Sequence, residues 1–69
     1  MGEYAKKLNV FEYDEWVRRV RKAMIDKDIT PLDLASITGY SVKTVYDSLR
    51  DYERCSRFFI ATVNERLEI

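Results

Sequence analysis

The chain has 69 residues, and its 12 basic side chains are balanced by 12 acidic ones, so the formal net charge is zero. At this length we expect one domain with a small core. The sequence holds no histidine and a single cysteine, Cys55, which excludes the commonest general base, an intrachain disulfide and a cysteine-based zinc site. It also has no Gly-rich phosphate loop, and we expect neither an enzyme nor a metal or other cofactor.

No apolar segment is long enough for a signal peptide or a membrane span, because the longest apolar run covers only residues 58–61. We therefore expect a cytoplasmic protein with no membrane partner. Glycine and proline are scarce, being confined to Gly2, Pro31 and Gly39. This scarcity favours long helices over many short strands joined by turns.

The first helix is predicted over residues 9–27. Its apolar side chains recur at intervals of three and four, which places them on one helical face. They are Tyr13, Trp16, Val17, Val20 and Met24. Asn9 and Glu12 have the spacing of a capping box, and Asp14 is the alternative cap of a shorter helix. The preceding residues 1–8 are predicted to form a flexible arm.

Two short helices follow, over residues 31–38 and 42–51. Thr30 is a good N-cap, and Pro31 suits the first helical position because the N–H that proline lacks would find no partner there. Gly39 matches the left-handed residue that ends many helices. A turn of about three residues between two short helices is typical of a helix-turn-helix.

A last helix is predicted over residues 56–67, with Ser56 as its cap. Its inward side chains are Phe59, Ile60, Val63 and Leu67. Because adjacent helical residues cannot both face one core, Phe58 is expected to be partly exposed. The sequence therefore predicts an all-α domain of four helices over residues 9–69.

Residues 30–49 resemble the motif of the lambda-repressor-like (xenobiotic-response-element type) helix-turn-helix family. The resemblance lies in small Ala35, in Gly39 four residues later, in Ser41 and in branched Val45, which fills the gap between the two helices. Both flanks also resemble the family, so the similarity covers residues 16–69. It implies a small domain of four helices, with five as the alternative, around a helix-turn-helix unit at about residues 30–51.

Three positions depart from the family pattern. Pro31 replaces a glutamine that often meets a phosphate, and Tyr40 replaces an aliphatic residue in the turn. Ser48 stands where an apolar residue is usual. We expect Leu49 to take the place of Ser48 in the core through a small rotation of the helix.

The resemblance implies a sequence-specific DNA-binding regulator of transcription, such as a repressor of phage or mobile-element type. The helix at 42–51 would enter the major groove of double-stranded DNA. The family's base-reading positions fall on Val42, Lys43, Tyr46 and Asp47. Contacts with the DNA backbone are expected from Ser41, Thr44, Arg50, Arg54 and the helix terminus at Thr30.

The chemistry of three of these side chains suits particular bases. Lys43 can donate to guanine, Val42 can pack on the methyl group of thymine, and Asp47 can accept from the amino group of cytosine. The plainer interpretation of Lys43 and Arg50 is a solvated helix surface. An acidic Asp47 repels phosphates unless Lys43, four residues earlier, neutralises it.

The charge balance favours an alternative to DNA binding. Residues 31–69 carry five basic and six acidic side chains, whereas DNA affinity comes largely from phosphate neutralisation. The alternative is a protein-binding helix-turn-helix module, such as an anti-repressor, inhibitor or adaptor, with a protein as its partner. On DNA we expect a homodimer through the last helix, with contacts at Phe58, Leu67 and Ile69.

Overall fold

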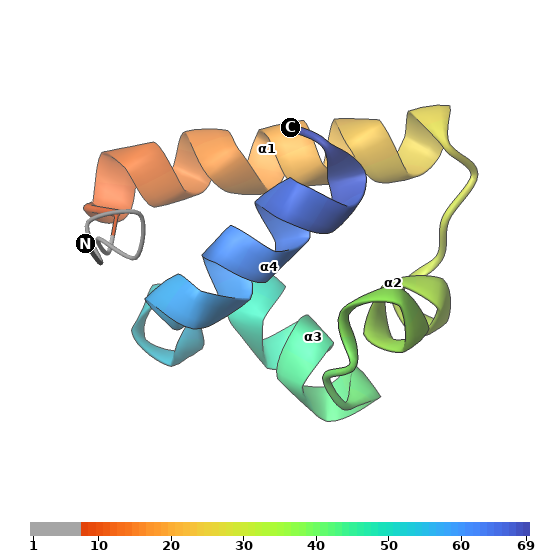
Figure 1. Cartoon of the computed structure of the whole chain (residues 1–69). Helices are drawn as coiled ribbons and strands as arrows, with labels where there is room; N and C mark the ends of the chain where they lie inside the picture. Colours follow the sequence, from red (N-terminus) through yellow and green to blue (C-terminus); the bar gives the residue numbers. More distant parts are fainter. Residues whose placement is uncertain (1–7) are drawn as a thin grey trace.

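The computed structural model describes residues 8–69, which form four α-helices and one 3-10 turn (Figure 1). The helices are α1 (Val10–Asp26), α2 (Pro31–Thr38), α3 (Val42–Arg50) and α4 (Arg57–Leu67), and the 3-10 turn covers Tyr52–Arg54. The all-α prediction is confirmed. Each predicted helix begins and ends within one residue of the observed one, and the 3-10 turn is an element that the sequence did not predict.

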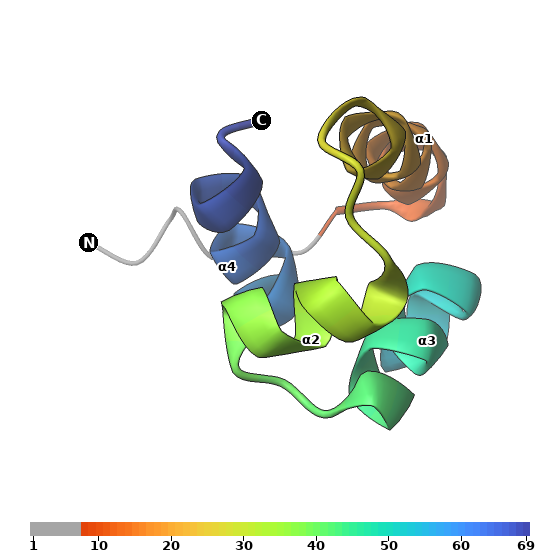
Figure 2. The ribbon, with the colours of Figure 1, turned by 90° about the vertical axis from the view of Figure 1, so that its right-hand side faces the viewer.

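The helices lie in two levels. α1 is the longest helix, and α4 crosses it at an angle (Figure 1). Viewed along α1, α4 lies beside it, with α2 and α3 below the pair (Figure 2). Within residues 8–69, no helix is both long and apolar enough to cross a membrane.

Side-chain caps fix where the helices begin. Asn9 is the N-cap of α1: its side chain accepts from the amide of Glu12 at 2.8 Å, and the Glu12 carboxylate accepts from the amide of Asn9 at 3.0 Å. Asp14 lies inside this helix. At the end of α2, Gly39 has a φ of 83°, the left-handed conformation expected from the sequence.

Trp16 is the centre of the core, with none of its surface exposed. Its ring packs edge-on against Phe59, with the ring centroids 6.2 Å apart, and its indole N–H donates to the side-chain oxygen of Asn64 at 2.6 Å. These contacts join α1 to α4. The remaining core side chains come from every α-helix and from Cys55; they include Tyr13, Val20, Met24, Leu34, Ala35, Val45, Leu49, Ile60, Val63 and Leu67.

Leu67 was expected to contact a second copy of the chain, but only 2% of this residue is exposed. Its side chain packs into the core with the other inward residues of α4, so it cannot contact a second copy of the chain. Phe58, by contrast, is 54% exposed, as predicted from its neighbour Phe59. The outward surface of α4 is therefore formed without Leu67.

Ser48 also differs from expectation. Leu49 is buried as predicted, but Ser48 is completely buried beside it and does not leave the core. The backbone carbonyl of Ser48 accepts from the hydroxyl of Tyr13 at 2.6 Å, whereas its own side-chain oxygen has no hydrogen-bond partner. Burial is the main cause that raises the pKa of Tyr13 to about 12, so this hydroxyl remains a donor at neutral pH.

Replacing Ser48 by alanine is expected to stabilise the protein by about 1 kcal/mol, because a buried hydroxyl without a partner carries an uncompensated desolvation cost. The measurement is the free energy of unfolding in urea. Ser36→Ala, at an exposed position of α2, is the control for the helix propensity of alanine. A Ser48→Ala variant that gains no more stability than this control would contradict the expectation.

The arm predicted over residues 1–8 lies outside the described residues, except for Leu8. This residue is partly buried against the core. Its backbone carbonyl accepts from the hydroxyl of Tyr52 at 2.8 Å. The chain is thus attached to the body of the domain one residue before the N-cap of α1.

Candidate functional site

α3 presents one buried face and one open face. Val45, Ser48 and Leu49 point inward and hold the helix on the domain. On the opposite face, Lys43, Tyr46 and Arg50 follow each other at helical spacing and are exposed. The structure thus brings three of the predicted site residues into one outward row, which we call the α3 row.

The predicted residues at the start of α3 are less open. Ser41 is its N-cap: the hydroxyl accepts from the amide of Thr44 at 3.1 Å and donates to the Thr44 hydroxyl at 2.9 Å. Val42 is partly buried and packs against the core. Ser41 and Thr44 lie beside the α3 row, whereas Val42 offers only part of its side chain to a ligand.

Asp47 is the acidic centre of this surface. Its carboxylate lies 2.9 Å from the ammonium of Lys43, and the same oxygen lies 3.4 Å from the guanidinium of Arg54. The hydrogen bond from Lys43 is the main cause that holds the pKa of Asp47 below its usual value. Asp47 therefore carries its negative charge at neutral pH, and the sequence-based pairing with Lys43 is present.

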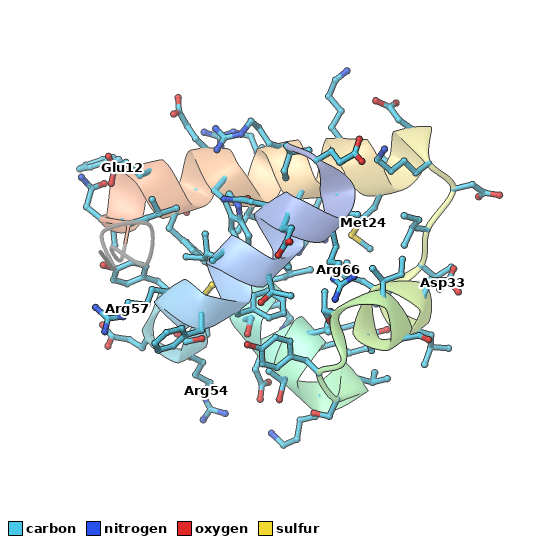
Figure 3. The ribbon with its side chains drawn as sticks, viewed as in Figure 1. Glu12, Met24, Asp33, Arg54, Arg57 and Arg66 are labelled. Carbon is cyan, nitrogen blue, oxygen red and sulfur yellow. The ribbon has the colours of Figure 1, made fainter. Side chains whose placement is uncertain are left out.

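Arg54 joins this network through the unpredicted 3-10 turn. Its guanidinium also lies 3.5 Å from the carboxylate of Asp51. Figure 3 shows Arg54 projecting away from the body of the molecule. The three-residue spacing between Asp51 and Arg54 was visible in the sequence, whereas the approach of Arg54 to Asp47 depends on the turn.

Cations outnumber acids on this surface by one. Lys43, Arg50 and Arg54 are accompanied by Asp47 and Asp51. Within residues 8–69, Arg50 has no ion-pair partner, so it is the cation most available to a ligand. The Lys43 side chain is 78% exposed in spite of its pairing, so it too can reach outward.

Arg21, on α1, is a neighbour of α3 that was not among the predicted site residues. Its guanidinium donates to the backbone carbonyl of Leu49 at 3.4 Å, near the end of α3. A cation from α1 thus lies at the C-terminal end of α3, where the helix dipole favours positive charge. Its sequence separation from α3 left no local signal for this contact.

A negatively charged side chain of the protein itself lies at the start of α2. The carboxylate of Asp33 accepts from the amide of Thr30 at 3.0 Å and from its hydroxyl at 3.1 Å. Pro31 has no N–H to offer. The phosphate contact expected at Thr30 stays a prediction, and the carboxylate of Asp33 adds a negative charge beside this helix terminus.

Comparison with protein-family models, with curated proteins and with solved structures finds no match for this chain. Over residues 8–69, histidine, cysteine, aspartate and glutamate side chains form no group of three that could hold a metal ion. The α3 row, with the ion pairs of Asp47, is the candidate site.

Proposed function

We propose that this chain is a sequence-specific DNA-binding regulator of the lambda-repressor-like helix-turn-helix type, and that α3 reads the major groove. The α3 row carries the proposal: Lys43, Tyr46 and Arg50 stand outward on a helix whose other face is buried. α2 precedes it through a tight turn at Gly39. A short helix held in this way is the element that such domains place in the groove.

The side chains of the row have separate roles in this proposal. Lys43 donates to guanine and Arg50 contacts a phosphate. Asp47 holds Lys43 and Arg54 by ion pairs before DNA arrives, so nonspecific DNA gains little from these two cations. A G·C base pair, in which guanine accepts from Lys43 and cytosine donates to Asp47, replaces both partners at once, which favours specific sites.

The test begins with selection of a preferred duplex from random DNA, followed by fluorescence anisotropy titrations over a series of salt concentrations. Lys43→Ala is expected to cost about 1–3 kcal/mol on the selected site and to relax the preference at one base pair. Arg50→Ala is expected to weaken binding to all sequences alike. Arg18→Ala, at an exposed position of α1, is the control and is expected to leave affinity nearly unchanged.

Asp47→Asn is the most specific test of the ion-pair network. Removing the carboxylate frees Lys43 and leaves Arg54 with Asp51 alone, so affinity for random duplex DNA should rise while discrimination falls. Equal affinity for selected and random DNA in the unmodified protein would contradict the proposal.

A protein-binding module is the second candidate, and the ion pairing of Lys43 and Arg54 within the chain favours it. These cations are then part of a surface with a net charge of only one, which a protein partner covers. The same titrations distinguish the two candidates, because this one predicts no DNA binding even at low salt.

A further inference from the structure

The outward face of α4 carries an open groove on the side away from the core. It has a volume of about 580 Å³ and is lined by Phe58, Ala61, Thr62, Asn64, Glu65 and Ile69. Phe58 and Ile69 are large, apolar and 54% and 41% exposed. They stand toward opposite ends of α4, and the residues between them include the small Ala61 and Thr62. The face therefore has a protruding ring at one end and room for such a ring further along.

Charges on this face change sign along the helix. Arg57 lies at the start of α4, with its guanidinium carbon 5.2 Å from the centroid of the Phe58 ring. Glu65 and Glu68 lie toward the end. Arg66 does not cancel them there, since its side chain is turned toward α2 (Figure 3). Within residues 8–69, Arg57, Glu65 and Glu68 have no ion-pair partner.

We infer that this face binds a second copy of the chain, with the two α4 helices antiparallel. A helix that is positive at its start and negative at its end is complementary to the same helix in the opposite direction. A two-fold axis between Ala61 and Thr62 places Phe58 of each copy in the groove of the other. The same axis brings Arg57 of each copy toward Glu65 and Glu68 of the other, as the isologous symmetry of a two-fold dimer requires.

The contact is small, because one helical face contributes it. Stable interfaces bury about 1,200–2,000 Å² in total, or roughly 600–1,000 Å² from each partner, whereas one face of the 11-residue α4 is only roughly 16 Å long and 10 Å wide. The dimer is therefore weak, and its population rises with protein concentration. It does not involve the α3 row, so its failure and that of DNA binding are separate results.

Sedimentation equilibrium over micromolar to millimolar concentrations tests the dimer in the absence of DNA. The average mass should rise from 8.2 kDa toward twice that value. Phe58→Ser should weaken dimerisation at least tenfold, whereas Phe11→Ser, at an 82% exposed ring on α1, should not change it. Circular dichroism verifies that both variants remain helical. A protein that stays monomeric throughout overturns the inference.

Charge reversal tests the antiparallel arrangement itself. Arg57→Glu and Glu65→Arg place like charges opposite each other, so each variant alone should dimerise at least tenfold more weakly. An equimolar mixture of the two restores both opposite-charge contacts in the heterodimer and should recover the mass of the unmodified protein. The double variant should recover it as well. If neither recovers, or if the single variants dimerise normally, the α4 pairing is wrong.

Discussion

Trp16→Ala is expected to unfold a large fraction of the protein at room temperature. The side chain is completely buried, and replacing a buried tryptophan by alanine costs about 3–5 kcal/mol. A chain of this length has a total stability of roughly 3–10 kcal/mol. The substitution also removes the N–H that binds Asn64 and the ring that packs on Phe59, so the connection between α1 and α4 is lost.

Helical circular dichroism during urea titration measures this effect. Trp16→Phe keeps an aromatic ring and loses the indole N–H, so its free energy of unfolding should lie between those of Trp16→Ala and the unmodified protein. Phe11→Ala removes an equally apolar but exposed ring from the same helix and serves as the control. Similar unfolding midpoints for Trp16→Ala and Phe11→Ala would contradict the central role of Trp16.

Leu34→Ala is expected to have the second-largest effect, a loss of about 2–5 kcal/mol. α2 buries only Leu34 and Ala35, so most of its attachment depends on one side chain. Loosening of α2 also removes the support beneath the turn at Gly39 that leads into α3. Under the proposed function, DNA affinity should therefore fall although Leu34 itself cannot reach the DNA.

Hydrogen exchange measures the loosening directly. The amides of α2 should exchange much faster in Leu34→Ala, and more so than those of α1. Leu32→Ala is the matched control, because this leucine lies on the same helix and is 65% exposed. Uniform acceleration in every helix would show instead that Leu34 stabilises the domain as a whole.

The helix boundaries were predictable because caps are local. Asn9, Thr30 and Ser41 each bind an amide three residues later, and such short-range pairs are visible in the sequence. Gly39 is equally local. The all-α architecture follows from these signals together with the spacing of apolar residues.

Ser48 shows what local patterns cannot provide. Its burial depends on Tyr13, which is 35 residues away in the sequence and approaches α3 from α1. α3 is therefore covered over a wider arc than its own apolar residues indicate. For Leu67 the local pattern was sufficient, because the spacing of apolar residues correctly predicted that it faces the core. The expected dimer contact at the same residue conflicted with that prediction, since it required Leu67 to be exposed.

The residues of the candidate site could be predicted from the sequence, whereas only one of the ion pairs of Asp47 could be. The resemblance to the helix-turn-helix family indicated Lys43 and Tyr46, Arg50 was expected beside them at the DNA backbone, and the four-residue spacing indicated the pair of Lys43 and Asp47. The additional pair of Arg54 with Asp47 depends on a 3-10 turn. Whole-chain charge counts could not reveal this pairing, because it arises from the path of the backbone between α3 and α4.

The shared carboxylate of Asp47 has a thermodynamic consequence for binding to any polyanion. On a polyanion without the preferred base pair, Lys43 and Arg54 exchange the carboxylate of Asp47 for a phosphate. Fewer small ions are then released into solution than the number of cations in contact. The logarithm of affinity should therefore fall with the logarithm of salt less steeply than the roughly 0.9 per phosphate contact expected for unpaired cations. Asp47→Asn should restore the steeper dependence.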